Sequence, residues 1–413
     1  MVVVAQLGAR MHYAVPRILH RAGMLERLYT DIYAPQLPRP FQTWASRFGP
    51  APVRRLLGRV PAEIPTEKVV SFAAMGIEYY RRKKFAAHHG SMAAAPLWAG
   101  QEFCRRVIRH GLGEASCVFA YNSAGMELFQ HARSAGVFSV MEQTFVSSQT
   151  EEDLLNAEEL EHPRWQQPCA KDPLRPAFRE REQMEWEAAD VILCGSEFVR
   201  NSIGMSGGPT KRCLVVPYGV SNKGPRVTKD LPHRPLRVLS VGAVGLRKGA
   251  PYVLEAARSM KNKADFCMAG QIDVIPDAQQ LLNSHIRLLG AVPRSEIHRQ
   301  FEWADVFLLP TLCEGSATVC YEALSYGLPV ITTPNAGSVV RDGVDGFIVP
   351  IRDAAAIVEC IERLVDDRDL WTTMSANAFS RASEFTLERY GERLLSVFAA
   401  EQMWERVNAN ARA

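Results

Sequence analysis

The sequence predicts an α/β protein with two doubly wound, Rossmann-like domains that face each other across a cleft. Short apolar segments alternate with amphipathic helical segments along most of the chain, which is typical of parallel sheets covered by helices on both faces. The alternation forms two series, separated by the polar, Pro/Gly/Lys-rich stretch 221–234. We therefore expect an N-terminal domain over 1–220, a C-terminal domain over 221–385, and a helix over 386–413 that crosses back to the first domain.

The first series begins with a buried strand over residues 2–7, because no basic segment precedes this apolar run as it would in a signal peptide. Residues 35–65 are rich in Pro and Arg and show little periodicity. From residue 115 onward the pattern is regular, with Gly136 ending one helix and Ser196 capping another. The expected strands cover 115–121, 137–141, 191–194 and 213–217.

The second series follows the polar stretch. Its expected strands cover 236–241, 266–269, 286–289, 306–309 and 330–332. The tripeptide Ala-Asp-Val occurs at 189–191 and again at 304–306. This repetition fits either an echo between two related domains or a helix-to-strand junction that is common in α/β proteins.

The composition excludes several classes of protein. Hydrophobic residues make up 47% and charged residues 23% of the 413 positions, as in ordinary globular proteins. No apolar run approaches the ~18–20 residues that span a bilayer. The nine cysteines are scattered without a C-x-x-C pair, which favours a reducing, cytoplasmic setting over a disulfide scaffold or a zinc site.

A pair of carboxylates, Glu314 and Glu322, follows the expected strand 306–309. Ligands of open α/β sheets bind outside the carboxyl ends of the strands, where Glu314 falls. The helix that follows would offer free N–H groups and a positive dipole end to a phosphate, and carboxylates accept hydrogen bonds from sugar hydroxyls. The alternative is an ordinary loop with a solvated glutamate.

A second motif, residues 241–249, joins an expected strand to a helix. It matches neither the dinucleotide fingerprint nor the P-loop, because the second glycine is displaced and no Ser or Thr follows Lys248. Gly242 permits a tight turn, while Arg247 and Lys248 supply the fixed positive charge that a diphosphate site without a metal needs. A solvated basic loop is the alternative reading.

Together with several neighbouring segments, these motifs resemble the family-4 retaining glycosyltransferases of the GT-B fold. The resemblance covers about residues 180–350 in the order in which the family has its motifs. The matching segments are 189–200, 215–220, 247–249, 304–310, the pair Glu314 and Glu322, 327–330 and 343–349.

The resemblance implies a nucleotide-diphosphate sugar as co-substrate in the second domain, an acceptor in the first, and neither a metal nor a further cofactor. Glu314 would contact the hydroxyls of the donor sugar, Glu322 the ribose, and Arg247 and Lys248 the diphosphate; Glu314, Arg247 and Lys248 are the expected catalytic residues. The remaining donor-binding candidates are Gly242, Arg294, Gly315, Ser316, Ala317, Thr318 and Val319.

The chain departs from the family pattern in places. Ala243 stands where many members have a second phosphate-binding arginine, and Ala317 where many have a glycine. In the first domain the glycine-rich loop that is usual in the family is reduced. The residues expected to contact the acceptor are therefore chosen only by their position at the ends of strands. These residues are Gly8, Arg10, His12, Asn122 and Glu142.

For the mechanism, retention is compatible with double displacement or with front-face attack. We favour front-face attack, because both glutamates are assigned to binding and no other carboxylate is an evident nucleophile. The resemblance points to the synthesis of a cell-surface polysaccharide or glycolipid. Two alternatives are a catalytically silent protein that binds nucleotide sugars and a GT-B enzyme that modifies a nucleotide sugar without transferring it.

The charge is unevenly distributed. The net charge of +3 combines a balance of +11 over residues 1–110 with −7 over 111–220 and −1 over the rest. Basic clusters lie at 54–59 and 81–84, the second flanked by Tyr79, Tyr80 and Phe85. This region is either a solvated basic face or a peripheral contact with the anionic inner face of the plasma membrane, beside a sugar or lipid-linked acceptor. No nucleic acid is expected, since no binding motif accompanies the charge.

Overall fold

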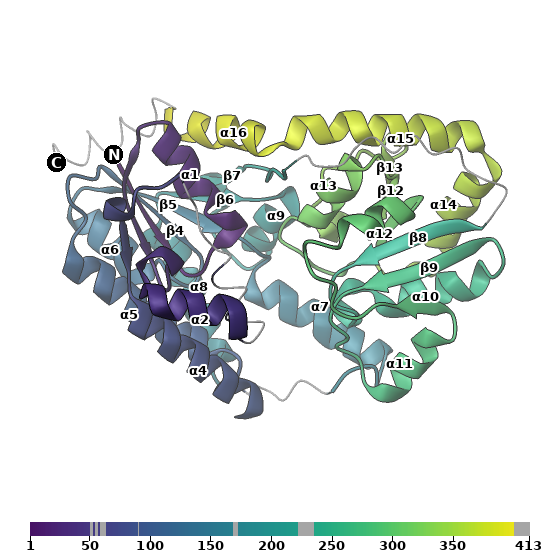
Figure 1. Ribbon diagram of the computed structural model, residues 1–413, viewed down its shortest axis with the longest axis horizontal. Helices are drawn as coiled ribbons and strands as arrows, with labels where there is room; N and C mark the ends of the chain where they lie inside the picture. Colours follow the sequence, from purple (N-terminus) through teal and green to yellow (C-terminus); the bar gives the residue numbers. More distant parts are fainter. Residues whose placement is uncertain are drawn as a thin grey trace.

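The computed structural model describes residues 1–49, 53, 57, 63–89, 91–167, 172–221 and 235–399. Within these ranges the chain forms two parallel β-sheets in two α/β domains that lie side by side (Figure 1). The predicted fold class is confirmed. The stretch 222–234, expected as the linker, and residues 400–413 of the expected last helix lie outside the described residues.

The N-terminal sheet has seven strands in the order β3-β2-β1-β4-β5-β6-β7. The strand order reverses between β1 and β4, so that their carboxyl ends flank the topological switch point. The strands are β1 (Val2–Gln6), β2 (Leu25–Thr30), β3 (Val69–Ser71), β4 (Cys117–Tyr121), β5 (Phe138–Gln143), β6 (Val191–Cys194) and β7 (Cys213–Val215). The helices are α1 (Ala14–Arg21), α2 (Arg39–Phe48), α4 (Ala73–His89), α5 (Ala94–His110), α6 (Met126–Ser134), α7 (Ser148–Glu161), α8 (Arg175–Ala188) and α9 (Glu197–Met205).

The C-terminal sheet has six strands in the order β10-β9-β8-β11-β12-β13, with its switch point between β8 and β11. The strands are β8 (Leu236–Val241), β9 (Ala264–Ala269), β10 (Ile286–Leu288), β11 (Val306–Leu309), β12 (Val330–Thr332) and β13 (Gly346–Ile348). The helices are α10 (Ala250–Ser259), α11 (Pro276–Asn283), α12 (His298–Trp303), α13 (Thr318–Ser325), α14 (Ala354–Asp366), α15 (Arg368–Ala382) and α16 (Leu387–Ala399).

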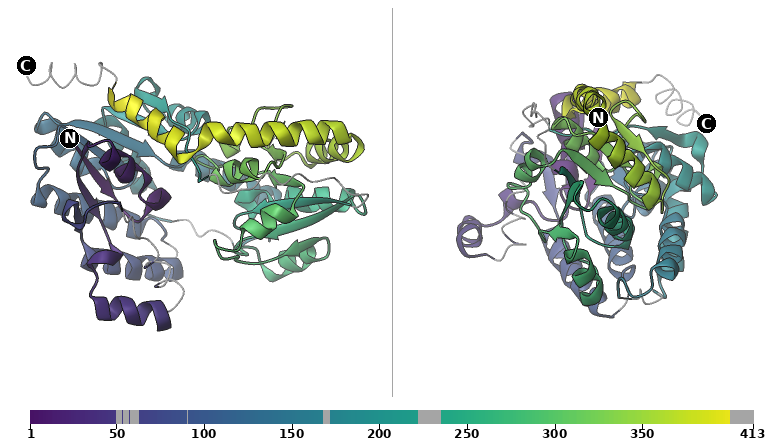
Figure 2. Two further views of the ribbon diagram at one scale, coloured as in Figure 1. Left: turned by 45° about the horizontal axis from the view of Figure 1, so that its top comes forward. Right: turned by 90° about the vertical axis from the view of Figure 1, so that its right-hand side faces the viewer.

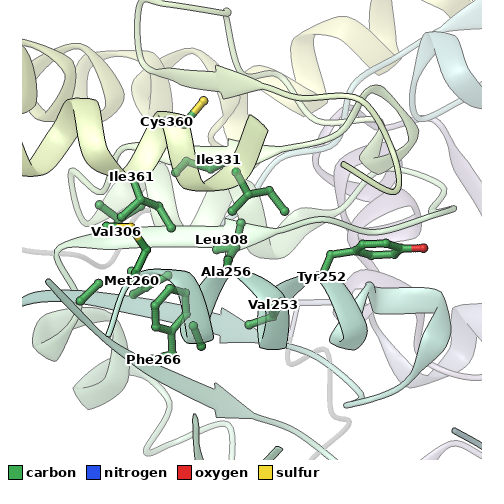
Figure 3. Packing of buried hydrophobic residues seen from close by; sticks show 14 of the residues in the cluster. Tyr252, Val253, Ala256, Met260, Phe266, Val306, Leu308, Ile331, Cys360 and Ile361 are labelled. Atoms are coloured by element: carbon green, nitrogen blue, oxygen red, sulfur yellow. The ribbon is translucent and has the colours of Figure 1, made fainter. Parts of the chain in front are cut away.

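Helices cover both faces of each sheet. Successive side chains along a strand therefore enter hydrophobic clusters on opposite faces. On β11, Val306 and Leu308 enter one hydrophobic cluster, while Phe307 and Leu309 enter the cluster on the opposite face. Figure 3 shows the first of these clusters, where side chains of α10 and α14 pack over β11. A strand buried on both faces needs apolar residues at every position, which is why these strands were visible in the sequence.

All the strands expected from the sequence are present, with ends that differ by up to two residues. Three strands were not expected. The strand β2 carries half-buried Glu26 and Arg27 among its apolar residues, so it lacks a continuous apolar run. The other two, β3 and β13, have three residues each.

The last two helices run along one edge of both domains (Figures 1 and 2). Trp371 of α15 lies in a core cluster of the C-terminal sheet, whereas Tyr390 and Phe398 of α16 lie in a cluster with Phe119 of the N-terminal sheet. The described part of the expected helix 386–413 therefore packs on the first domain.

The eight cysteines in the described ranges are buried free thiols; Cys169 lies outside these ranges. None of the helices in the described parts of the chain is long and apolar enough to cross a membrane.

Candidate active site

The two motifs expected to bind the donor meet at the switch point of the C-terminal sheet. Lys248 and Arg247 lie on a short 3-10 turn (Leu246–Lys248) that follows β8, and Glu314 lies in the loop after β11. Lys248 Nζ is 2.7 Å from Glu314 Oε1, and Arg247 Nη1 donates a hydrogen bond to the same oxygen. One carboxylate thus bridges two cations, and the cluster keeps a net positive charge that a phosphate could neutralise.

Backbone contacts hold these two loops together. The backbone carbonyl of Arg247 accepts hydrogen bonds from Leu312 N and from Thr311 Oγ1, both at 2.8 Å. Gly242, with a φ of 141°, leaves room for Lys248: a Cβ at this glycine would lie 3.0 Å from Lys248 Cε. The glycine therefore lets the lysine fold back over the end of β8 towards Glu314.

Residues 315–319 connect this cluster to the start of α13. Gly315 approaches the first domain so closely that a Cβ there would lie 1.9 Å from the backbone oxygen of Thr144. Ser196 Oγ donates a hydrogen bond to the Gly315 carbonyl across the domain boundary. The side chain of Ser316 bonds internally, to Tyr321 Oη at 2.6 Å and to the Gly337 carbonyl at 3.1 Å. The Ser316 hydroxyl is therefore committed to contacts within its own domain.

The remaining members of the segment lie at the start of α13. Ala317 is buried and precedes the helix, and its N–H donates to the Ala336 carbonyl. Thr318 and Val319 are the first two residues of the helix.

Glu322 lies further along α13, within reach of Arg294. Arg294 Nη2 is 3.5 Å from Glu322 Oε1, and burial raises the pKa of the Glu322 carboxyl. The donor-binding candidates on β8, β11, α13 and the loop at 294 thus gather around one end of the C-terminal sheet. Within the described ranges, no group of three His, Cys, Asp or Glu side chains could hold a metal ion.

Three of the five acceptor-side candidates line one pocket. Gly8, Arg10 and Asn122 border a cavity of about 1040 Å³ at the carboxyl ends of β1 and β4, the switch point of the N-terminal sheet. Arg10 Nη1 donates to Thr144 Oγ1 at 3.0 Å, and this hydroxyl donates to Asn122 Oδ1 at 2.8 Å. Because Thr144 also abuts Gly315, this end of the pocket lies next to the loop after β11, which carries Glu314 and Gly315.

The other two candidates lie elsewhere. His12 is exposed on the turn after β1 and is not among the residues described as lining the pocket. Glu142 is 3% exposed and lies in the core, where its Oε1 accepts a hydrogen bond from Tyr218 Oη at 2.9 Å. Burial raises the pKa of Glu142 to about 7. Its position at a strand end, which suggested an acceptor contact, instead points it towards the helix α16 that covers this face, where it is close enough to interact with Tyr390.

One segment of the first domain, residues 144–166, lies on the C-terminal domain and was not expected from the sequence; we call it the bridging segment. It includes α7, which lies between the two sheets in Figure 1. Glu158 on this helix is fully buried and accepts hydrogen bonds from Arg352 Nε at 2.7 Å and Tyr252 Oη at 2.8 Å. Both partners belong to the C-terminal domain.

The end of the bridging segment touches the turn that carries the two cations. Gln166 Oε1 accepts a hydrogen bond from Leu246 N at 3.2 Å, and Gln166 Nε2 donates to the Asp273 carbonyl at 3.0 Å. Earlier in the segment, the ring of Phe145 lies 5.5 Å from the Arg247 guanidinium. No signal in the sequence distinguishes Glu158 from the solvated glutamates around it, since its partners are distant along the chain.

The comparisons with known proteins agree with this arrangement. Residues 235–367 match the family model of glycosyl transferases group 1. The chain is 29% identical over 194 residues to the amylovoran biosynthesis glycosyltransferase AmsK of Erwinia amylovora, covering 42% of this chain and 47% of that protein. It is 28% identical over 166 residues to the N,N'-diacetylbacillosaminyl-diphospho-undecaprenol alpha-1,3-N-acetylgalactosaminyltransferase of Campylobacter jejuni, covering 39% of this chain and 44% of that protein.

The chain thus spans about half the length of the curated relatives it matches. Among solved structures, HepE of Anabaena in complex with UDP and glucose aligns with a TM-score of 0.63 at 14% identity, over 97% of this chain and 99% of that one. This likeness shows the fold, a GT-B arrangement of two Rossmann-like domains.

Proposed function

We propose that this chain, whose residues 235–367 belong to the group 1 glycosyl transferases, moves a sugar from a nucleotide-diphosphate sugar to an acceptor hydroxyl with retention of the anomeric configuration. The observation that carries the proposal is the cluster of Glu314, Arg247 and Lys248 at the switch point of the C-terminal sheet. This cluster offers two cations to a diphosphate and one carboxylate to a sugar within a single contact network.

In the proposed reaction the donor diphosphate replaces Glu314 as the partner of Arg247 and Lys248. The carboxylate, released from the cations, then accepts hydrogen bonds from the donor sugar. The bond between the anomeric carbon and the phosphate oxygen breaks while the acceptor oxygen bonds to the same face. The leaving phosphate takes the acceptor proton, and the two cations stabilise its growing negative charge without a metal.

Glu322 completes the proposed donor site by accepting hydrogen bonds from the ribose hydroxyls. The nucleotide itself is open among UDP, GDP, ADP and TDP. Because HepE was solved with UDP and glucose, UDP-sugars are the first donors to test.

The acceptor is proposed to belong to the synthesis of a cell-surface polysaccharide or glycolipid. Relatives named for amylovoran biosynthesis and for an undecaprenol-linked acceptor support this reading. A catalytically silent protein that binds nucleotide sugars remains the second candidate, because the same cluster would bind a donor without transferring the sugar.

The test is a thermal-shift screen of the four nucleotide-diphosphate sugars, followed by assays of hydrolysis and transfer with the best donor. Glu322→Ala should lose most of the nucleotide affinity, since each unpaired buried hydroxyl costs about 1–3 kcal/mol. Glu314→Ala should lose transfer while it still binds the free nucleotide. Glu302→Ala, on exposed α12, is the matched control. Donor binding without any hydrolysis or transfer would favour the silent protein.

Peripheral contact of residues 1–110 with the anionic inner face of the membrane is a further part of the proposal. The basic residues of the cluster 54–59, namely Arg54, Arg55 and Arg59, lie outside the described residues, while Arg81, Arg82, Lys83 and Lys84 are exposed on α4. Co-sedimentation with phosphatidylglycerol vesicles should occur at low salt and decrease at high salt. It should also decrease when the four basic residues are replaced by Gln. A chain that stays in solution at low salt would contradict membrane contact.

A further inference from the structure

We propose that the pocket at the ends of β1 and β4 binds an acceptor that carries a phosphate or diphosphate, with Lys83 and Lys84 as the pair that holds this group. The inference rests on the proposed transferase function and names the chemical class of its acceptor. The observation that supports it is that the basic side chains of α4 lie on two different faces of the helix, and that only Lys83 and Lys84 border this pocket.

Helix α4 forms one wall of the pocket. Its lining residues recur at helical spacing and lie on one face of the helix: Ala73, Gly76, Ile77, Tyr79, Tyr80, Lys83 and Lys84. Gly76 lets the helix start close against the loop after β2, because a Cβ there would lie 2.5 Å from Ile32 Cγ1. Lys84 is eight residues further along, or about 12 Å, so the two lysines border the part of the pocket away from this contact.

The four consecutive basic residues of α4 have different partners. Arg82 Nε pairs with Glu78 at 2.9 Å, and its guanidinium lies 4.2 Å from the ring of Trp98. Arg81 Nη1 is 4.0 Å from the same carboxylate. Both arginines, with Glu78, border a different hollow on the other side of the helix. The run 81–84 is therefore not one functional unit.

The two lysines lack such partners. In the described part of the chain, neither Lys83 nor Lys84 forms an ion pair, and Lys84 Nζ lies 5.0 Å from the ring of Tyr80. Arg10, at the other end of the pocket, likewise contacts a hydroxyl and the ring of Tyr121 but no described carboxylate. The acidic residue that lines the pocket, Asp31, already accepts hydrogen bonds from Gly8 N at 2.9 Å and Thr30 Oγ1 at 3.2 Å.

Two lysines without carboxylate partners, together with Arg10 on the same pocket, favour an anionic ligand. A phosphate satisfies several ammonium and guanidinium donors at once, and Lys is a common phosphate ligand. The rest of the wall is largely apolar, with side chains of Leu7, Ile32, Leu37, Ile77 and Phe178. The pocket therefore suits a phosphate attached to an apolar group better than a free sugar.

The position of the pocket predicts the orientation of the bound ligand. Arg10 is linked through Thr144 to the donor loop at Gly315, whereas the lysines lie further along α4. An acceptor with its reactive hydroxyl near Arg10 would thus place its phosphate towards Lys83 and Lys84. The apolar part of the ligand would then lie along the wall formed by Ile77 and Phe178.

The test measures binding of three probes to the full chain by calorimetry. Farnesyl diphosphate carries a diphosphate on an apolar chain, glucose 1-phosphate is a soluble sugar phosphate, and farnesol has the chain alone. The double variant Lys83→Gln/Lys84→Gln should bind the phosphorylated probes at least about tenfold more weakly than the wild type. The matched double variant Arg81→Gln/Arg82→Gln, on the other face of α4, should bind them as the wild type does.

The two sources of the phosphate are distinguished by the probes. Tighter binding of farnesyl diphosphate than of glucose 1-phosphate and farnesol indicates a lipid-linked acceptor. Tighter binding of glucose 1-phosphate than of farnesyl diphosphate, with farnesol the weakest, indicates a soluble sugar phosphate. Both orders support a phosphate site, whereas farnesol binding as tightly as farnesyl diphosphate would contradict it. Unchanged affinity in the lysine variant would overturn the inference. Loss of vesicle binding in that variant with unchanged probe affinity would also overturn it, and would assign the lysines to membrane contact.

Variants and assays of the proposed donor site distinguish a failure of this inference from a failure of the proposed function. Lys248→Ala should leave the affinity for the probes unchanged. If the affinity falls in Lys248→Ala but not in the double lysine variant, the probes do not bind in the pocket, and the inference is refuted. A wild type that hydrolyses a donor but binds no probe through Lys83 and Lys84 refutes this inference alone. A wild type that neither binds nor turns over any nucleotide-diphosphate sugar refutes the proposed function.

Discussion

Replacing Arg352 by Ala should weaken the attachment of the bridging segment to the C-terminal domain. Arg352 Nε donates to the fully buried Glu158, and its Nη2 donates to the Leu154 carbonyl at 3.0 Å. The variant leaves a buried carboxylate that still accepts a hydrogen bond from Tyr252 Oη and has His162 Nε2 at 3.6 Å, but has lost its arginine. Since Arg352 has a φ of 64°, Ala keeps a Cβ and therefore a similar backbone cost at this position.

The magnitude follows from the burial of the pair. Removing one partner of a buried ion pair costs about 3–5 kcal/mol, and the lost bond to Leu154 about 1 kcal/mol more. Because the Arg352 side chain is 30% exposed, water can reach part of the space it leaves, so we expect a loss of about 3 kcal/mol in the free energy of unfolding. Glu158→Gln in the same background removes the unpaired charge and should recover part of this loss.

The assay is urea unfolding followed by circular dichroism, on both single variants and the double variant. Arg299→Ala, on exposed α12, is the control for removal of a surface arginine and should change stability by less than about 0.5 kcal/mol. A loss below about 1 kcal/mol for Arg352→Ala would refute the reasoning. A double variant less stable than Arg352→Ala alone would also refute it, because the unpaired carboxylate would then not be the source of the cost.

Three further outcomes follow from the site and the core. Gln166→Ala should raise the KM for the donor more than it lowers kcat, because it frees the N–H of Leu246 next to the proposed phosphate cations; steady-state kinetics at varied donor concentration tests this. Lys248→Ala should lower the transfer rate on the order of 10²–10³-fold, and EDTA should leave the wild type active, so that loss restored by Mn²⁺ would contradict a metal-free reaction. Glu142, with a pKa of about 7 in the folded protein, holds a proton more tightly than the unfolded chain does, so the contribution of this residue to the free energy of unfolding should fall as the pH rises from about 4.5 to 7. Glu142→Gln should therefore gain up to about 3 kcal/mol over the wild type at pH 8, a difference that shrinks towards pH 5 and is measured by denaturation across this range.

The clustering of Arg247, Lys248 and Glu314 could be predicted because these residues follow buried strands. The apolar runs before Gly242 and Glu314 identify β8 and β11 in the sequence, and parallel strands bring their carboxyl ends to one edge of the sheet. Arg247 and Lys248 therefore had to lie near Glu314 if β8 and β11 were neighbours, as they are. The pairing itself was not visible in the sequence, since strand order depends on which helices cross which face.

Which of the acceptor-side candidates line the pocket could be predicted only in part, because a position at a strand end does not determine where the side chain points. Asn122 and Glu142 both lie at carboxyl ends of neighbouring strands, yet Asn122 lines the pocket while Glu142 faces the core beneath α16. Adjacent positions on a strand alternate between the two faces of a sheet, so an error of one residue in register exchanges the faces. The buried Glu158 was missed for a related reason: its partner Arg352 is 194 residues away along the chain.

The basic run 81–84 shows how helix geometry separates residues that adjoin in the sequence. In sequence, Arg81, Arg82, Lys83 and Lys84 form one cluster, and one membrane contact accounts for all four. On α4 the arginines share the carboxylate of Glu78, while the lysines border the acceptor-side pocket. Replacing all four at once would therefore remove two interactions together. Only the two double variants, each tested with vesicles and with phosphorylated probes, assign the positive charge to a bilayer or to a bound phosphate.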